Sequence, residues 1–69
     1  MKQQTVILQD VYSDKGDMLR IEAIDSETGK PYLDFLWDPR DEQTPENREA
    51  FRKWAGHILT SKQVKIAGA

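Results

Sequence analysis

The chain turns twice in the same way: Ser13-Asp14-Lys15-Gly16-Asp17 returns thirteen residues later as Ser26-Glu27-Thr28-Gly29-Lys30. Each loop joins two stretches that are rich in β-branched and aromatic residues. A three-residue hairpin connection is commonly a type I turn followed by a residue in the left-handed region, which glycine enters without steric cost. Gly16 and Gly29 therefore predict two consecutive β-hairpins.

The two turns also predict which residues face each other across the strands. Counting outward from Ser13 opposite Asp17, and in the same way from the second loop, makes one face of the sheet almost entirely apolar. The expected pairs are Ser26 with Lys30 at the second turn and, on the apolar face, Ile7 with Ala23, Val11 with Leu19, Ala23 with Leu33, Ile21 with Phe35 and Leu19 with Trp37. A slip of one residue in either hairpin would mix charged residues into these rows.

Three strands and one helix follow from the alternation of polar and apolar residues. The strands are expected at residues 4–12, 18–25 and 31–37. After a polar break at residues 38–43, Thr44 followed by proline is typical of a helix start, with the threonine as the cap. The helix is expected over Pro45 to Thr60, with a core-facing stripe made of Ala50, Phe51, Trp54, Ala55 and Ile58.

The predicted fold class is therefore α+β, a three-stranded antiparallel β-meander followed by one α-helix packed on one face (β-β-β-α), in a single domain of residues 1–69. Trp37 and Trp54 are expected to face each other in the core between sheet and helix. Residues 62–66 alternate weakly and indicate a short C-terminal fourth strand, parallel to its neighbour, or else a tail. Val64 and Ile66 favour the strand, because they would otherwise be exposed.

Size and composition limit the class of protein. With 69 residues the chain is near the lower end for a single hydrophobic core, so self-association is an alternative that would bury more surface. No cysteine is present, which excludes disulfides and thiolate metal sites. The first residues contain no apolar run typical of a signal peptide, and no segment approaches the roughly 20 apolar residues that span a membrane. We therefore expect a cytoplasmic protein without a membrane partner.

Charge is distributed unevenly along the chain. All twelve acidic residues lie between Asp10 and Glu49, where only five basic residues accompany them. From Ala50 onward the chain contains no acid and four cations, which are Arg52, Lys53, Lys62 and Lys65. The predicted sheet is therefore acidic and the end of the helix is basic, in part because cations near a helix carboxyl end interact favourably with its dipole.

The second face of the predicted sheet is the main candidate for a binding site. Its expected rows are Val6, Ile24 and Tyr32; Leu8, Glu22 and Asp34; Asp10, Arg20 and Leu36; and Tyr12, Met18 and Asp38. An apolar patch of this kind marks an interaction site, and the excess of carboxylates over the single Arg20 suits another protein with a basic surface. The predicted partner-binding residues are Tyr12, Met18, Arg20, Glu22, Tyr32, Asp34 and Leu36.

Two other interpretations of this face are weighed against binding. In the first, a small sheet simply leaves some apolar side chains exposed, with Asp10 and Arg20 as an ordinary cross-strand pair. In the second, the adjacent carboxylates of Glu22 and Asp34 catalyse a reaction. A carboxylate pair without an evident cleft or a second motif is weak grounds for an enzyme, and we predict no catalytic residue.

The order of elements resembles two families of DNA-binding domains. A three-stranded meander followed by a helix, with Thr28-Gly29-Lys30 before the third strand and a helix start near Thr44, is similar in outline to AP2-type domains and to the arm-binding domains of some integrases. This resemblance spans residues 4–60 and implies that the exposed sheet face enters the major groove with Arg and Lys. Here that face has only Arg20 among four carboxylates, which would forfeit the counterion release that drives such binding.

An alternative surface for DNA or RNA lies at the basic helix end and C-terminal tail. Its residues are Arg48, Arg52, Lys53, Lys62 and Lys65. Scattered cations of this kind are also typical of a solvated helix face.

The remaining motifs indicate no metal or cofactor site. His57 is the only histidine, and Ser61 stands where a second ligand would be needed at i+4. The two glycine loops are too short and acidic to cradle phosphate. The favoured interpretation is a non-enzymatic protein–protein interaction module, similar in size and character to small phage or mobile-element proteins that inhibit a host protein. A structural homodimer that buries the same face is the further alternative.

Overall fold

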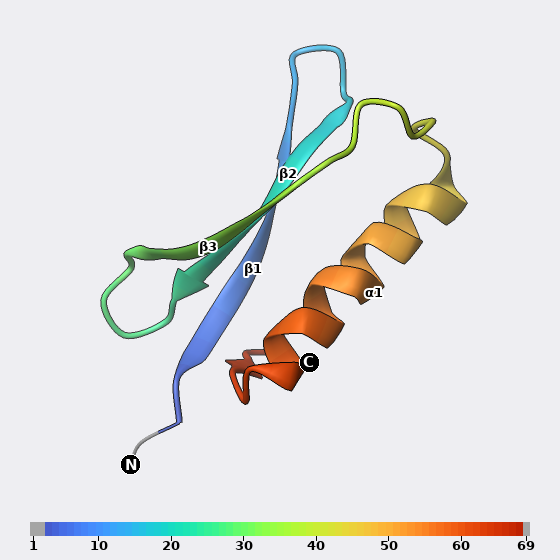
Figure 1. The fold of residues 1–69 in the computed structure, drawn as a ribbon. Helices are drawn as coiled ribbons and strands as arrows, with labels where there is room; N and C mark the ends of the chain where they lie inside the picture. Colours follow the sequence, from blue (N-terminus) through green and yellow to red (C-terminus); the bar gives the residue numbers. More distant parts are fainter. Residues whose placement is uncertain (1–2, 69) are drawn as a thin grey trace.

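In the computed structural model, which describes residues 3–68, the chain forms four strands and one helix. The elements are β1 (Thr5–Tyr12), β2 (Met18–Asp25), β3 (Pro31–Leu36), α1 (Pro45–Ser61) and β4 (Lys65–Ile66). The strands form one sheet in the order β3-β2-β1-β4, antiparallel except for β4, which is parallel to β1 (Figure 1). The predicted α+β class and the short fourth strand are therefore confirmed.

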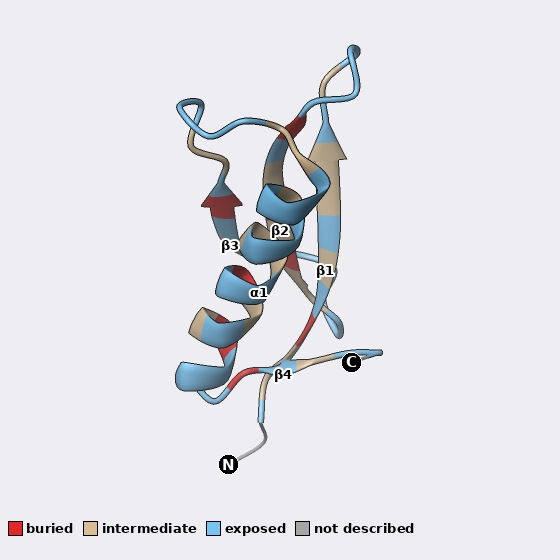
Figure 2. Ribbon diagram, turned by 90° about the vertical axis from the view of Figure 1, so that its right-hand side faces the viewer, coloured by how far each residue is buried: buried red, intermediate tan, exposed pale blue. Residues whose placement is uncertain are grey.

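The helix lies along one face of the sheet, and the hydrophobic core fills the layer between them (Figure 1). Figure 2 shows buried residues in red on the strands and on the turns of α1. The buried residues are Val6, Met18, Ile21, Ala23, Phe35, Ala55, Leu59 and Val64. Around them pack Leu8, Leu33, Trp37, Phe51, Ile58 and Ile66. Within residues 3–68 no element covers the opposite face of the sheet, which stays open to solvent.

Both predicted glycine turns are present, and the first closes as expected. Gly16 has a φ of 86° and Gly29 a φ of 73°, which is the left-handed region that glycine enters without strain. In the first turn, the backbone N–H of Ser13 donates to the carbonyl oxygen of Asp17 at 2.8 Å.

A β-bulge directly after the first turn shifts the register of β1 by one residue. Tyr12 pairs with Met18, but the next residue, Val11, pairs with Arg20. Leu19 is therefore an extra residue in β2. A shift of one residue exchanges the two faces of a strand, so the predicted register of β1 is wrong beyond this point.

The bulge exchanges the predicted faces of β1 and of the start of β2. Val6 and Met18, which were expected on the second face, are buried in the core, and Leu8 packs beside them. Ile7 and Leu19, which were expected in the core, are 48% and 46% exposed. The sequence pattern favours the predicted register because it keeps Asp10 out of the apolar rows, but both faces of β1 carry large apolar residues, and on the helix side Asp10 has Arg52 as a partner.

The second hairpin also contains a bulge, but this one restores the predicted register. The turn closes at Asp25, whose N–H donates to the carbonyl oxygen of Lys30 at 2.9 Å, one residue earlier than predicted. Tyr32 is then an extra residue in β3. Beyond it the predicted pairs of β2 and β3 are confirmed, including Ile21 with Phe35.

The start of α1 is the predicted one. The hydroxyl of Thr44 accepts a hydrogen bond from the backbone N–H of Asn47 at 3.1 Å, and a proline occupies the first turn. The Asn47 side chain also donates to the carbonyl oxygen of Glu42 at 2.8 Å. The loop before α1 is thus bonded to the helix, and Gln43 bonds it to Met18 of the sheet.

The buried stripe of α1 differs from the predicted one. Ala55 and Leu59 are fully buried, and Leu59 is not part of the predicted stripe. Trp54, which was expected in the core, is 49% exposed. The helix is turned toward β1, where its Arg52 meets Asp10 at 2.8 Å. This contact exists because the bulge in β2 places Asp10 on the helix side of the sheet.

The end of α1 is a Schellman motif without glycine. The N–H of Val64 donates to the carbonyl oxygen of Leu59 at 3.0 Å. The N–H of Gln63 donates to the carbonyl oxygen of Thr60 at 2.9 Å. Gln63 takes the left-handed conformation that the motif requires, with a φ of 62°. Val64 is buried in the core, and the chain continues from it into β4.

Candidate functional site

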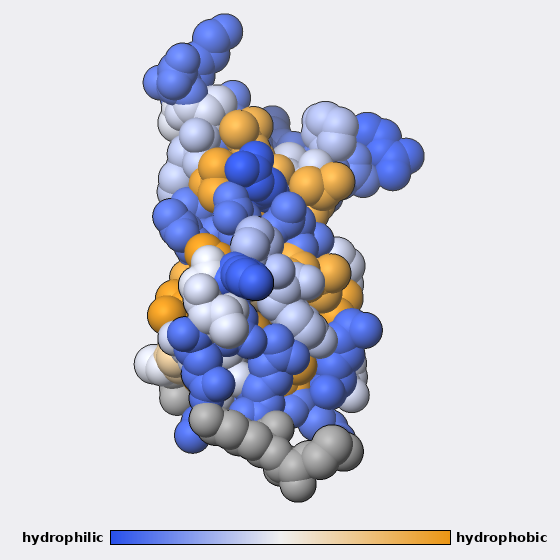
Figure 3. All heavy atoms as spheres, turned by 90° about the vertical axis from the view of Figure 1, so that its left-hand side faces the viewer, coloured by the Kyte–Doolittle hydropathy of each residue, from blue (hydrophilic) through white to orange (hydrophobic). Residues whose placement is uncertain are grey.

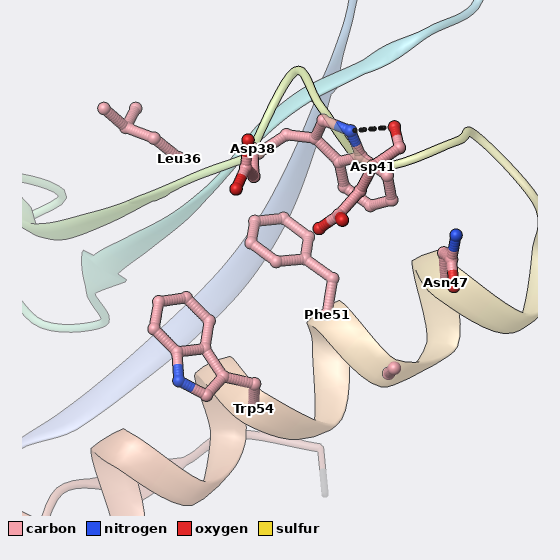
Figure 4. A pocket seen from close by; sticks show the side chains of 8 residues that line it. Leu36, Asp38, Asp41, Asn47, Phe51 and Trp54 are labelled. Atoms are coloured by element: carbon pink, nitrogen blue, oxygen red, sulfur yellow. Dashed lines mark hydrogen bonds between the residues drawn. The ribbon is translucent and has the colours of Figure 1, made fainter.

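A solvent-open hollow lies between the end of β3, the loop that follows it and the first half of α1 (Figure 4). Its volume is about 430 Å³. One side is lined by Leu36, Trp37, Asp38 and Asp41, and the side formed by α1 is lined by Asn47, Ala50, Phe51 and Trp54. We call this site the aromatic hollow, after its residues Trp37, Phe51 and Trp54.

The rings of the aromatic hollow hold one another in place. Phe51 lies between the two tryptophans, with its ring centre 5.1 Å from that of Trp37, edge to face, and 6.0 Å from that of Trp54, nearly parallel. Trp54 in turn meets Phe35 of the core edge to face at 5.5 Å. The indole N–H of Trp37 donates to the carbonyl oxygen of Asp41 at 3.2 Å. Because aromatic pairs add about 0.5–1.5 kcal/mol each, these contacts stabilise the positions of the rings.

Two apolar residues at the aromatic hollow have strongly exposed side chains. Leu36 is 71% exposed and Trp54 is 49% exposed. They come from different elements: Trp54 projects from α1, whereas the Leu36 side chain is directed from β3 toward the open face of the sheet, away from α1 (Figure 4). Exposed apolar side chains on both faces of this edge mark it as a candidate interaction site. The sequence prediction missed this site because it assigned both tryptophans to the core. The one available signal is the polar segment 38–43, which leads the chain away from the sheet directly after Trp37.

The charged residues among those that line the aromatic hollow are both acidic. Arg40 donates to Asp38 from Nη2 at 2.9 Å and from Nε at 3.1 Å. This contact, together with the backbone N–H of Arg40, holds the pKa of Asp38 below its usual value. The carboxylate of Asp41 makes no hydrogen bond or close ion pair within residues 3–68, and it attracts Arg40 at longer range. Figure 4 shows it beside the ring of Phe51.

β3 is an edge strand, and its free side borders the aromatic hollow. The N–H of Trp37 donates to the carbonyl oxygen of Leu19 at 3.1 Å, which fixes the alternation of bonds between β3 and β2. The backbone groups of Asp34 and Leu36 therefore point away from β2, toward the free edge. Outward N–H and C=O groups on an edge strand are a template for a further strand.

Four of the seven predicted partner-binding residues share the open face of the sheet. They are Arg20, Glu22, Asp34 and Leu36, which pair across β2 and β3. Arg20 Nη2 lies 3.0 Å from Glu22 Oε1, so the predicted pairing of Arg20 with Asp10 is wrong. Figure 3 views this face and shows apolar atoms in separate groups among hydrophilic ones, not in one continuous patch.

The other three predicted residues, Tyr12, Met18 and Tyr32, lie elsewhere. Met18 is buried in the core, 1% exposed. The hydroxyl of Tyr12 donates to Asp10 at 3.1 Å and accepts from Arg52 of α1 at 3.0 Å, which places it on the helix side of the sheet. Tyr32 is the bulged residue of β3 and lines a second hollow beside the C-terminal end of α1. The expected placement of these three on the open face is therefore wrong.

The cations of the alternative nucleic-acid surface are spread over the molecule. The carboxylate of Asp10 binds Arg52 at 2.8 Å and raises the pKa of its guanidinium. Arg48 Nε donates to Gln43 Oε1 at 3.2 Å. The exposed cations are Lys53 in α1, Lys62 at its C-cap and Lys65 in β4. Both arginines are thus engaged in internal contacts.

Within the described range 3–68, no three His, Asp or Glu side chains come together as a metal site. Over the same residues, no helix combines the length and the apolar character needed to cross a membrane. Comparisons of the chain with protein-family models, with curated proteins and with solved structures each find no match. The function of the site is therefore inferred from its geometry and chemistry.

Proposed function

We propose that this chain is a non-enzymatic module that binds a protein with a basic surface, through the aromatic hollow and the neighbouring residue Asp34. The observation that carries this proposal is the exposure of two large apolar side chains at one edge of the molecule, Trp54 at the aromatic hollow and Leu36 on the adjoining open face of the sheet. Large exposed side chains beside a preformed hollow are typical anchors of protein interfaces. Relative to the sequence-based hypothesis, the binding surface moves from the centre of the open face to its β3 edge.

Charge complementarity supports a basic partner. Asp38 and Asp41 line the aromatic hollow. Asp34 lies two residues before Leu36 in β3, and therefore on the same face of the strand. The cation next to them, Arg40, is already bonded to Asp38. Opposite charges speed the encounter of two proteins, and like charges penalise wrong partners. A nucleic acid fits this surface poorly, because its phosphates would meet the same carboxylates.

A peptide-display selection on the immobilised chain tests the proposal. Trp54→Ala removes the exposed side chain at the aromatic hollow, and Leu36→Ser removes the one on the open face beside it. Ile7→Ser is the matched control, since Ile7 is 48% exposed but lies on β1, away from the hollow. We expect peptides selected on the native chain to bind the Ile7→Ser variant equally well and to lose affinity about tenfold or more on the other two.

Two results would contradict the proposal. The first is a selection that enriches no peptide, or peptides whose binding neither anchor substitution weakens. The second is a dimer in sedimentation equilibrium that Leu36→Ser dissociates, since the surface would then join two copies of the chain. Thermal melts by circular dichroism check that each variant folds. Leu36→Ser, at a strongly exposed strand position, keeps the test valid if Trp54→Ala proves unstable.

A further inference from the structure

The aromatic hollow has the chemistry of a site for a cation, and the adjoining edge of β3 can bind the backbone of an extended chain. We propose that the occupant is an extended partner segment that adds to β3 as a further strand and places one lysine or arginine side chain in the aromatic hollow. This inference rests on the proposed function and specifies the chemistry of its partner.

The aromatic rings supply the first part of the cation site. The face of an aromatic ring attracts a cation through its quadrupole, and tryptophan does so most strongly. Trp54 is half exposed, and its nearly parallel neighbour Phe51 holds it in place. Figure 4 shows both rings projecting from α1 toward β3 and the loop that follows it. A side chain arriving from β3 therefore meets ring surface that is already in position.

Asp41 supplies the second part, a carboxylate near the rings. Its carboxylate points toward Phe51 in Figure 4 and has no hydrogen-bond or ion-pair partner within residues 3–68, although it attracts the nearby Arg40 at longer range, while its carbonyl oxygen accepts from the indole N–H of Trp37 at 3.2 Å. A cation between a ring and a carboxylate gains from both, whereas a neutral side chain gains only the contact with the rings. Asp38 contributes less, because Arg40 already binds it at 2.9 Å.

The register of β3 brings the two halves of the proposal together. Asp34 and Leu36 direct their backbone groups to the free edge, so a segment added there bonds to these two residues. The residue of that segment opposite Phe35 points to the helix side of the sheet, as Phe35 does. Phe35 is in edge-to-face contact with Trp54 at 5.5 Å, so a long side chain at this position extends over the aromatic hollow.

Four blocked pentapeptides titrated into the ¹⁵N-labelled chain test this inference by NMR. Their sequence is Thr-Val-Lys-Val-Thr, with the central residue also made arginine, norleucine or glutamine. We expect the lysine and arginine peptides to shift the amide signals of Asp34 and Leu36 and the indole N–H signal of Trp54. Their affinity should exceed that of the norleucine peptide by about threefold to tenfold.

Two variants separate the effect of the carboxylate from that of the net charge. Asp41→Asn removes the proposed counter-ion and should abolish most of the preference for lysine over norleucine. Asp14→Asn makes the same change in net charge at the tip of the first turn, and it should leave that preference unchanged.

Three results would overturn the inference. Equal affinities for the lysine and norleucine peptides would refute the cation site. They would not contradict the protein-binding function, which the display selection tests separately. A response of Trp54 without any shift at Asp34 and Leu36 would refute strand addition. No shift with any of the four peptides at millimolar concentration would refute both parts.

Discussion

The side-chain amide of Gln43 pairs with the backbone of Met18 as a neighbouring strand would. Gln43 Nε2 donates to the carbonyl oxygen of Met18 at 3.0 Å, and the N–H of Met18 donates to Gln43 Oε1 at 2.9 Å. Met18 is 1% exposed, so its backbone has little access to water as an alternative partner. Gln43 thereby anchors to the sheet the loop that carries Asp41.

We expect Gln43→Ala to lower the free energy of unfolding by about 1–3 kcal/mol, because it leaves two buried backbone groups of Met18 without partners. Urea denaturation followed by tryptophan fluorescence measures the change. Gln9→Ala, which removes an exposed glutamine from β1, is the matched control and should change the same quantity by less than about 0.5 kcal/mol. Equal effects of the two substitutions would contradict the anchoring role.

The ion pair between Asp10 and Arg52 should give a small coupling that depends on salt. The two side chains are 28% and 39% exposed, so solvent screens their interaction. In a double-mutant cycle of Asp10→Asn and Arg52→Met we expect a coupling of about 0.5–1 kcal/mol, which falls in about 1 M NaCl. A coupling that salt leaves unchanged would show that Arg52 acts through the packing of its stem.

Asp25 links the stability of the second hairpin to pH. Its Oδ1 accepts from the N–H of Glu27 at 2.8 Å and from that of Thr28 at 3.1 Å, and its Oδ2 accepts from Gln4 Nε2 at 3.0 Å. The two backbone donors, with Gln4, hold the pKa of Asp25 below its usual range. A carboxyl group with a lowered pKa stabilises the fold above its unfolded pKa, and this stabilisation is lost as pH falls through the folded value.

We therefore expect the melting temperature of the native chain to fall as pH decreases from about 5 to about 2, and Asp25→Asn to reduce that dependence. Asn still accepts hydrogen bonds at this position but does not titrate. Asp14→Asn is the control, since the carboxylate of Asp14 has no partner among residues 3–68. Circular dichroism melts at each pH measure this dependence. If the melting temperatures of both variants depend on pH as strongly as that of the native chain, the role of Asp25 is refuted.

Gln63→Gly should stabilise the protein. A left-handed conformation costs an ordinary residue about 1–2 kcal/mol, and glycine avoids this at an entropy cost of about 0.5–1 kcal/mol. We expect a net gain of about 0.5 kcal/mol, which raises the melting temperature by about 2–4 °C. Gln63→Ala keeps the Cβ atom and should bring no gain. Equal melting temperatures of the two variants would show that the φ of 62° is not strained.

Much of the fold is predictable from the sequence because its strongest signals are local. Gly16 and Gly29 specify the two turns, and Thr44 followed by Pro45 specifies the start of the helix. The pairing of β2 with β3 is also predictable, because the alternation of apolar residues on these strands favours one register. These features agree with one another, and agreement of this kind is what allows a short sequence to specify a fold.

The candidate site is predictable only in part, because it depends on a bulge that no local pattern encodes. The bulge in β2 moves Asp10 to the helix side, where it binds Arg52. The helix is turned accordingly, and Trp54 lies at the surface instead of in the core. The predicted residues that remain at the site, Asp34 and Leu36, are those on β3, whose register follows the sequence pattern.

The free edge of β3 is short, and this limits edge-to-edge aggregation. At one end Pro31 has no N–H to donate and Tyr32 is bulged, and at the other end the chain leaves the sheet after Trp37. Asp34 and Leu36 direct backbone groups outward between these two points, and Asp34 adds a charge. Fibril-like stacking uses segments of about six residues with low net charge. The edge therefore has room for one short guest strand, while concentrated solutions should stay free of fibrils.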